Sequence, residues 1–519
     1  MNIWKAVGTI GGLTMVSRVA GFGREMLMSR IMGASAAADA FLVAFRLPNT
    51  FRRLFGEGAF SAGFVPLFSQ RYHGEGGAEE AKKFSEEVLA VFLPTLVLFT
   101  LVFEVIMGPV VAAISGYGGE KLALATFLTR VTFPYLLLIS LVSLFSGILN
   151  SLTRFTAAAF APALLNLAML GAMLLVPDGG AVTATALAIG VTVGGVIQLA
   201  LLIAAARRAG ISLRLRRPQM TPGVRQFVRV VIPATLGAGV YQISAFIDTF
   251  FLARIGTGAM SWFNYADRLN QLPLGVIGAA LGTAILPQVS RHVGAGDNDK
   301  AARVQGEATE LAMLLCLPAA LALCVAAEPL IGALFQGGEF RPDDVRITAL
   351  VLSIIVLGLP AYVLVKVLTP GFYSRQDTAT PVKTAAFVLL ANVVLNFVLI
   401  PPFGIAGLAA AIAIASWLNC VILYVILHRR GHFRIQGWLA GRVARQLVAA
   451  AAMVGALIAV RMVLGDWFTG GVAKRMIGVI AIVGAGMAVY FPLVWVIGGL
   501  DKDAFKALLR RKRPVEDAG

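Results

Sequence analysis

The sequence predicts an all-α polytopic membrane protein with fourteen transmembrane helices. Hydrophobic residues make up 58% of the 519 residues and charged residues only 14%, and the mean hydropathy is +0.83. Typical soluble domains carry roughly 25% charged residues, and single cores stop growing beyond about 250–300 residues. The composition therefore excludes a soluble enzyme, a disordered chain and a disulfide-stapled secreted domain. Little strand-like alternation is visible, which favours helices over a barrel.

Apolar windows of about 20 residues, enough to cross a hydrocarbon layer of about 30 Å, recur along the whole chain. They span residues 5–29, 37–66, 86–112, 125–149, 157–176, 183–206, 226–252, 263–290, 306–330, 346–372, 382–400, 405–427, 444–463 and 475–499. We interpret the first window as a retained helix and not a signal peptide. Arg18 and Arg24 separate its apolar part from the small residues at Ala34-Ser35-Ala36, whereas a cleavage site follows its apolar core closely.

The distribution of basic residues predicts the orientation in the membrane. An even number of helices puts both termini on one side, and most of the 44 Lys and Arg residues fall in loops on that side. Positive charge marks the cytoplasmic side, so we expect both termini to be cytoplasmic. This also accounts for the net charge of +17, and we expect no nucleic-acid partner. The basic tail 500–519 is either a solvated segment or a short interfacial helix.

Short motifs of the first half recur in the second. Arg30-Ile31 matches Arg254-Ile255, and Ala44-Phe45-Arg46-Leu47 matches Ala266-Asp267-Arg268-Leu269. The shift corresponds to six helices, so the two copies have the same orientation, as in transporters built from parallel repeats. We predict four parts: an N-terminal six-helix lobe (1–220), a C-terminal six-helix lobe (221–435), helices 13 and 14 (436–499) and a cytoplasmic basic tail (500–519). Chance similarity between apolar helices is the alternative explanation.

Charged side chains inside the predicted helices are the main functional signal. When the basic residues near the window ends are counted with the loops, seven are assigned to the helices: Arg18, Arg24, Arg46, Arg52, Arg53, Arg268 and Lys366. Each costs about 2.5–3.5 kcal/mol at a helix centre facing lipid, so they are expected to face one another, acidic partners or a wet cavity. Buried salt bridges that pin helices are one explanation. The available acids are Glu25, Asp39, Glu57 and Asp267.

A second explanation is recognition of a polyanionic headgroup. Asp39, Arg46 and Arg53 are spaced by seven residues and so share a helix face. Buried ion pairs hold helices together poorly because desolvation offsets their attraction. Arginine outnumbers lysine in this set, and its forked guanidinium suits bidentate binding of phosphate or carboxylate. We therefore favour an arginine-lined cavity.

The second half is poorer in such residues and offers one candidate cation site. Asp248 with Asn392 and Asn396 can supply oxygen ligands, although helix–helix hydrogen bonding explains the asparagines equally simply and is preferred here. The three cysteines lie in apolar runs and the four histidines lack metal-ligand spacing. We expect no metal, no cofactor and no catalytic residues.

Two segments resemble a known family. The run SRVAGFGREMLMSRIMGASAAADAFLVAFRLPNTFRRLFGEGAFSAGFVPLF and the run NYADRLNQLPLGVIGAALGTAILPQVS are similar to the MurJ/MviN family of bacterial lipid II flippases, and the resemblance extends over essentially the whole chain. It implies the fold of the multidrug/oligosaccharidyl-lipid/polysaccharide exporter superfamily. In that fold two six-helix lobes form a V around a cationic cavity, and helices 13 and 14 line a lipid groove.

The resemblance also implies roles for individual residues. The cavity arginines of the family match Arg18, Arg24, Arg52 and Arg268, with Arg46 at a position that is often lysine, and the cavity carboxylates match Asp39 and Glu57. Asp267 is a further supporting carboxylate. The implied activity is transport of lipid II by alternating access across the cytoplasmic membrane, for cell-wall synthesis and cell shape. The implied partners are lipid II, membrane lipids and cell-wall synthesis machinery, for a protein that is expected to be a monomer.

Three other functions fit a chain of this class. The first is a flippase for another polyprenyl-linked oligosaccharide. The second is a multidrug or cation antiporter on the same fold, which would have a carboxylate-dominated cavity. A membrane-embedded transferase is the third, and it would need metal-binding carboxylates or a catalytic dyad, neither of which the sequence offers. Helix 11 presents Asn392 and Asn396 where some family members place an acid, which puts sodium coupling in question.

Overall fold

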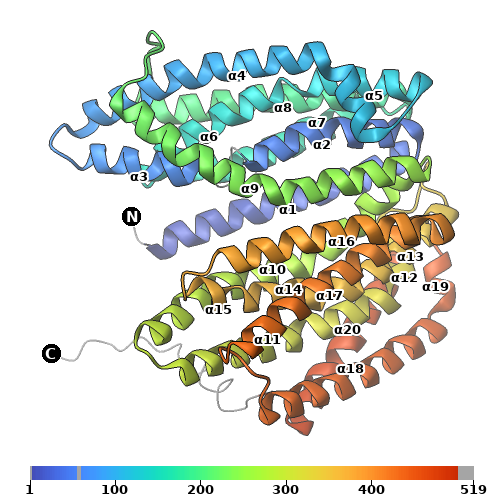
Figure 1. The fold of residues 1–519 in the computed structure, drawn as a ribbon. Coiled ribbons are helices and arrows are strands. Elements are labelled where there is room, and N and C mark those ends of the chain that lie inside the picture. Colours follow the sequence, from blue (N-terminus) through green and yellow to red (C-terminus); the bar gives the residue numbers. More distant parts are fainter. Residues whose placement is uncertain (1–2, 55–59, 501–519) are drawn as a thin grey trace. The chain divides into compact units, whose positions relative to one another are not determined.

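A computed structural model describes residues 3–54 and 60–500 of the chain (Figure 1). Apart from one isolated bridge between Gly337 and Phe340, the elements in these ranges are helices. Eleven helical segments of the described residues are long and apolar enough to cross a membrane. The prediction of an all-helical polytopic membrane protein is therefore confirmed. The predicted windows 5–29 and 226–252 and the described parts of 37–66 fall on further helices outside those eleven, so the count of fourteen crossings remains a prediction.

The chain divides into two compact units. Unit 1 comprises residues 1–261 with 337–341, and unit 2 comprises 262–336 with 342–519. The helices of unit 1 are α1 (Ile3–Met32), α2 (Ala36–Leu54), α3 (Phe60–Tyr72), α4 (Gly77–Ser115), α5 (Gly119–Thr132), α6 (Tyr135–Ser151), α7 (Thr156–Leu175), α8 (Ala181–Arg208) and α9 (Pro222–Ile255). Helix α10 (Ala259–Gly294) begins in unit 1 and continues into unit 2.

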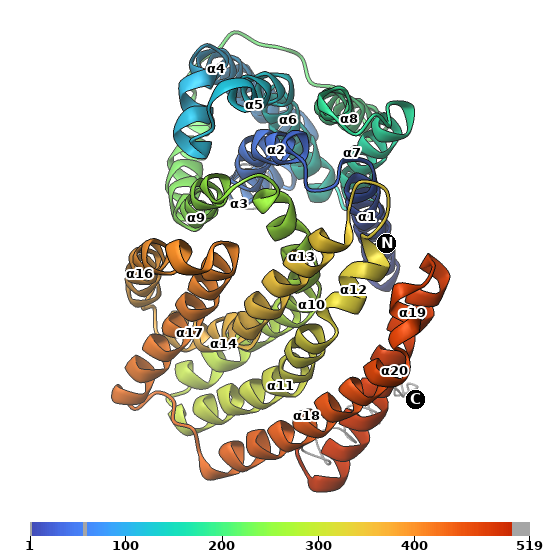
Figure 2. The same cartoon turned by 90° about the vertical axis from the view of Figure 1, so that its right-hand side faces the viewer.

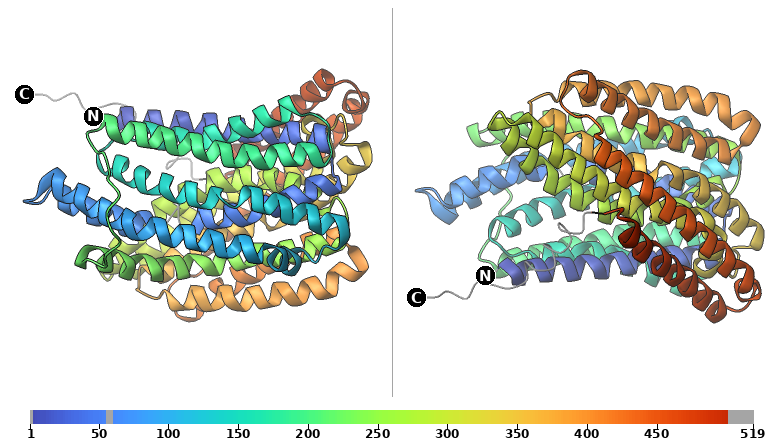
Figure 3. Two further views of the ribbon diagram at one scale, coloured as in Figure 1. Left: turned by 90° about the horizontal axis from the view of Figure 1, so that it is seen from above. Right: turned by 90° about the horizontal axis from the view of Figure 1, so that it is seen from below.

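The helices of unit 2 continue in chain order. They are α11 (Asn298–Val325), α12 (Ala327–Leu334), α13 (Pro342–Ile355), the 3₁₀ turn η2 (Val356–Gly358), α14 (Leu359–Leu368), α15 (Pro370–Tyr373), α16 (Ala379–Phe403), α17 (Ile405–Arg429), α18 (Gly437–Val463), α19 (Gly465–Thr469) and α20 (Val472–Ile497). Helices α18 and α20 carry the predicted helices 13 and 14, and they run side by side in Figures 2 and 3.

Unit 1 is held together by helix pairs and an aromatic core. Helix α1 packs on α7, α7 on α8, α2 on α5, and α4 on α9. Phe60, Phe64 and Phe227 meet with ring centroids 5.3–6.2 Å apart, within the 4.5–7 Å range of favourable aromatic pairs. Phe60 and Phe64 are fully buried. Such pairs fix how α3 and α9 face each other.

The connection between α8 and α9 is pinned to α4. Arg216 Nε donates to Glu86 Oε2 at 2.6 Å, and the backbone N–H of Arg214 donates to Glu86 Oε1 at 3.0 Å. Thr221 Oγ1 donates to Glu87 Oε2 at 2.8 Å and also caps α9 by accepting from the N–H of Val224. These bonds explain why a connection rich in arginine has one ordered path.

One connection belongs to the other unit from the helices that flank it. Residues 337–341, between α12 and α13, lie in unit 1 and pack on the C-terminal end of α1. The N–H of Glu339 donates to Arg30 O at 2.9 Å. Gly338 has a φ of +55°, and a Cβ at this position would lie 2.1 Å from Arg30 O. Only glycine fits both the left-handed conformation and this close approach.

In unit 2, α18 and α20 are anchored to α11. Their shared core contains the buried side chains of Leu317, Met453, Leu457 and Tyr490. Arg442 Nη1 donates to Glu310 Oε2 at 2.7 Å, with little of the carboxylate exposed. Because a buried carboxylate is costly without its partner, this pair ties α18 to α11 at a defined register.

Asp377 organises the connection that precedes α16. Its carboxylate accepts from the N–H and hydroxyl of Thr380 at 2.9 and 2.6 Å and from Arg430 Nη1 at 2.6 Å. The Thr380 hydroxyl and the Arg430 guanidinium stabilise the charged form and lower the pKa of the Asp377 carboxyl to about 2. The same carboxylate thus caps α16 and holds the end of α17 close to it.

Candidate functional site

Arg24 lies buried between α1 and α7, with 7% of its surface exposed. Its Nη1 donates to Asn166 Oδ1 at 3.0 Å and contacts Met169 Sδ at 3.4 Å, and its Nη2 donates to Glu25 Oε1. Its guanidinium also lies 6.0 Å from the ring centroid of Phe45. The structure therefore gives Arg24 an acidic partner and an amide acceptor, and these two contacts hold its guanidinium group in one orientation.

The other N-terminal arginines are held differently. Arg46 Nη2 donates to the backbone carbonyl of Ala245 on α9 at 3.1 Å, and Arg52 Nε donates to Asn49 Oδ1 one turn earlier at 3.0 Å. Arg18 is exposed on α1. Arg46 thus contacts a neutral oxygen and keeps its charge uncompensated at that contact, which is the state a phosphate-binding guanidinium needs. The side chain of Arg53 lies outside the described residues.

Asp39 belongs to α2, and its side chain is completely buried. Its carboxylate contacts the N-terminal end of α10. Oδ2 accepts from the N–H of Gly258 at 2.7 Å and from Lys121 Nζ at 3.1 Å. Oδ1 accepts from the N–H and hydroxyl of Ser261 at 3.1 and 2.9 Å. The carboxylate therefore acts as the N-cap of α10 from a distant helix, and its negative charge complements the helix dipole there. Its ionic partner in the structure is Lys121 and not an arginine.

Three of the remaining predicted residues lie on α10 and α14. Asp267 and Arg268 are adjacent on α10 and partly buried. Asp267 accepts long hydrogen bonds from Asn270 at 3.5 Å and Gln271 at 3.4 Å on its own helix. Glu57 lies outside the described residues. Lys366 is exposed on α14.

The candidate cation ligands occupy separate units. Asp248 is partly buried on α9 in unit 1, whereas Asn392 and Asn396 are buried on α16 in unit 2. Asn396 Nδ2 donates to Asn392 Oδ1 at 2.9 Å within the helix. This bond links the two asparagines along one helix face, while Asn396 Oδ1 is buried without a hydrogen-bond partner. In the ranges that the structure describes, no group of three or more His, Cys, Asp or Glu is arranged to hold a metal ion.

Three contacting residues were missed by reasoning from the sequence. Asn166 lies within an apolar window, and a polar side chain inside a membrane helix is itself a signal of a functional contact. Lys121 lies outside the predicted windows, and Ser261 gives no local signal because its role depends on a carboxylate 222 residues away. All three make contacts to predicted site residues that helical periodicity cannot reveal.

The chemistry that these groups offer is the binding of an anion, without a covalent step. Arginines on α1 and α2 supply hydrogen-bond donors and positive charge, and the carboxylates near them are already hydrogen-bonded as acceptors. Such a set suits recognition of phosphate groups.

Comparison with known proteins agrees with this chemistry. The family model described as lipid II flippase MurJ matches residues 28–478. The chain is 41% identical over 526 residues to the probable lipid II flippase MurJ of Rhizobium tropici, covering 99% of this chain and 98% of that protein. It is 38% identical over 467 residues to the lipid II flippase MurJ of Burkholderia cenocepacia, covering 88% and 90%.

Solved structures show the same fold. A lipid II flippase MurJ in an inward closed conformation superposes with a TM-score of 0.77 at 23% identity, covering 96% of this chain and 99% of that one. An inward-facing multidrug resistance transporter of the MATE family gives 0.63 at 16% identity, covering 82% and 98%. At such identities these structures establish the fold alone, whereas the family model and the sequence relatives establish the kinship. The chain belongs to the MurJ family.

Proposed function

We propose that this protein is a lipid II flippase of the bacterial cytoplasmic membrane. It moves the lipid-linked peptidoglycan precursor from the inner to the outer leaflet, with no covalent step. The observation that carries the proposal is the match to lipid II flippases along nearly the whole chain, at about 40% identity. The arginines on α1 and α2 support it, because guanidinium groups suit recognition of the diphosphate of lipid II.

In the proposed mechanism, Arg18, Arg24, Arg52 and Arg268 hold the diphosphate of the headgroup, and Arg46 adds positive charge. The two predicted lobes rock about the bound headgroup and open it alternately to the two sides. The polyprenyl tail stays in lipid and follows a groove formed by α18 and α20. Both termini are cytoplasmic in this scheme, and the chain crosses the membrane fourteen times.

Carboxylates limit how tightly the arginines bind. Glu25 pairs with Arg24 in the structure, so the diphosphate would replace Glu25 as the partner of that guanidinium. Exchange of one partner for another keeps a charge from standing alone in a low-dielectric site. Glu57 and Asp267 have the same proposed role, and Asp39 is proposed to support the site indirectly, by fixing the start of α10.

The relation to a multidrug or cation antiporter rests on fold alone. Transport of a cation favours a cavity dominated by carboxylates, whereas the charged residues of α2 include three arginines and one acid. A flippase for another polyprenyl-linked glycan uses the same diphosphate chemistry, and the test below separates it by its substrate.

The test is complementation of cells depleted of their own lipid II flippase. Arg18→Ala and Arg268→Ala should abolish growth rescue at normal membrane levels, because each removes a proposed diphosphate contact. Arg303→Ala is the matched control, since Arg303 is an exposed arginine paired with Glu307 on α11. Full rescue by both cavity variants would overturn the diphosphate role.

Two measurements complete the test. Depletion of this protein in its own host should raise lipid II in the inner leaflet, and an unchanged level would argue for another glycan lipid. A reporter fused after Gly519 should read cytoplasmic. A reading on the opposite side would refute the even number of crossings.

A further inference from the structure

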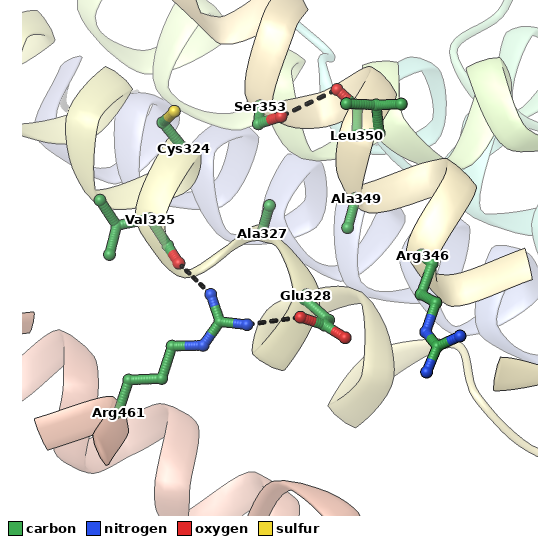
Figure 4. Close-up of a pocket in the computed structure, with 9 residues that line it drawn as sticks. All are labelled: Cys324, Val325, Ala327, Glu328, Arg346, Ala349, Leu350, Ser353 and Arg461. Carbon is green, nitrogen blue, oxygen red and sulfur yellow. Dashed lines mark hydrogen bonds and ion pairs between the residues drawn. The ribbon is translucent and has the colours of Figure 1, made fainter. Parts of the chain in front are cut away.

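A polar pocket lies at one end of the unit 2 helices, and none of the predicted transport residues lines it. Its volume is about 400 Å³, within the range of roughly 300–1,000 Å³ that small-ligand pockets occupy. The ends of α11 and α12, one face of α13 and the end of α18 form its walls (Figure 4). Its polar lining consists chiefly of Glu328, Arg346, Arg461 and Ser353.

The length of α18 indicates where the pocket would lie in a membrane. Helix α18 has 27 residues, about 40 Å at 1.5 Å per residue, whereas the hydrocarbon layer is about 30 Å thick. Arg461 lies two residues from the C-terminal end of this helix, and Glu328 lies in the first turn of α12. When α18 crosses the membrane, both side chains are therefore at the interface and not in the hydrocarbon.

The charges of the pocket have both signs. Arg461 donates to Glu328 Oε2 through Nη2 and to Val325 O through Nη1, the latter at 3.3 Å. Glu328 lies between the guanidinium groups of Arg461 and Arg346 in Figure 4. The side chain of Arg346 is 73% exposed, and its only ion pair with a described residue is a long one, 3.7 Å to Asp343. The guanidinium of Arg346 is thus accessible to an anion, and the carboxylate of Glu328 lines the same pocket.

Exposed apolar side chains lie in the pocket and on the helix end that carries Arg461. Leu350 lines it and is half exposed, and Met462 and Val463, next to Arg461, are among the most exposed apolar residues of the described chain. A polar pocket bordered by exposed apolar surface matches the division of a phospholipid into headgroup and acyl chains. An exposed ion pair alone contributes only about 0–1 kcal/mol, so holding α18 in place is a poor explanation for this arrangement.

We propose that this pocket binds the headgroup of a zwitterionic phospholipid that carries a primary ammonium group. The phosphate contacts the guanidinium groups of Arg346 and Arg461, and the ammonium donates to Glu328. A purely anionic headgroup would place negative charge beside Glu328, and a choline headgroup has no N–H to donate. Both are therefore expected to bind less tightly. The proposal does not depend on which substrate the protein transports.

The test is lipid titration of the delipidated full-length protein in detergent, followed by native mass spectrometry. Phosphatidylethanolamine should bind at least about fivefold more tightly than phosphatidylglycerol or phosphatidylcholine. Glu328→Gln should abolish the preference for phosphatidylethanolamine over phosphatidylglycerol. Arg346→Gln should weaken the binding of each of these two lipids about fivefold. Arg303→Gln, which changes an exposed arginine elsewhere on unit 2, should leave all three affinities unchanged.

Each contrary result has a definite meaning. Equal binding of the three lipids, or a preference that survives Glu328→Gln, overturns the proposal. Tighter binding of phosphatidylglycerol identifies a simple anion site and also overturns it. Soluble phosphorylethanolamine should compete only weakly, because the acyl chains contribute contact with the apolar border. Equal competition by this soluble compound would overturn the assignment to a membrane lipid.

Discussion

Replacing Asp39 with asparagine tests the proposed cap of α10. The carboxylate accepts four hydrogen bonds, two at each oxygen: Gly258 N–H and Lys121 at Oδ2, and the N–H and hydroxyl of Ser261 at Oδ1. In either orientation of the amide, its NH₂ group faces two former donors. The hydroxyl of Ser261 can rotate to accept, but a backbone N–H cannot.

The expected loss follows from these contacts. Hydrogen bonds to a charged group contribute about 1.5–3 kcal/mol each, and removing one partner of a buried ion pair costs about 3–5 kcal/mol. Lys121 is 18% exposed at its side chain and regains some hydration. We therefore expect local destabilisation of about 3 kcal/mol, which corresponds to roughly a hundredfold more opening at 1.4 kcal/mol per factor of ten.

Hydrogen exchange of the purified protein measures this opening directly. The amides of Gly258 and Ser261 should exchange about a hundredfold faster in Asp39→Asn, while exchange in α16 stays unchanged. Ser261→Ala removes only the hydroxyl bond and should accelerate exchange by about tenfold, the low end of the range for one bond to a charged group. An Asp39→Asn protein whose Gly258 and Ser261 amides exchange within threefold of the wild-type rate would refute the cap.

Three further predictions concern other contacts. Asn166→Leu removes the acceptor that lies 3.0 Å from Arg24; it should reduce growth rescue at normal membrane levels, and full rescue would show that the amide does not position the guanidinium. Gly338→Ala should speed hydrogen exchange of the following amide, since its Cβ would lie 2.1 Å from Arg30 O; an unchanged exchange rate contradicts the packing. The pKa of Asp377 lies below its usual 3.8, at about 2, so its stabilising contribution is present above about pH 4 and lost as the pH falls towards 2. Asp377→Asn should lower the melting temperature followed by circular dichroism at neutral pH and flatten its acid dependence, and an acid dependence equal to wild type would count against this ion pair.

Several features of this protein follow from local sequence alone. Composition and the length of the apolar windows predict helices that cross a membrane, and eleven of those windows correspond to spanning-length helices in the described chain. The long motif around Arg18, Arg24 and Asp39 resembles the MurJ family, and the comparisons confirm the membership. Such signals are local or cumulative, because hydropathy depends on neighbouring residues and a motif is a contiguous string.

The partners of the charged residues were decided only by tertiary structure. Sequence spacing grouped Asp39 with the arginines of its own helix, whereas the fold places it against Lys121 and the start of α10. The same holds for Arg24, whose amide acceptor Asn166 lies on α7. Helical periodicity fixes which face a side chain occupies, but the identity of the helix opposite that face depends on packing between segments more than eighty residues apart. That packing is set by the summed shape of many apolar contacts, and no single residue in the sequence encodes it.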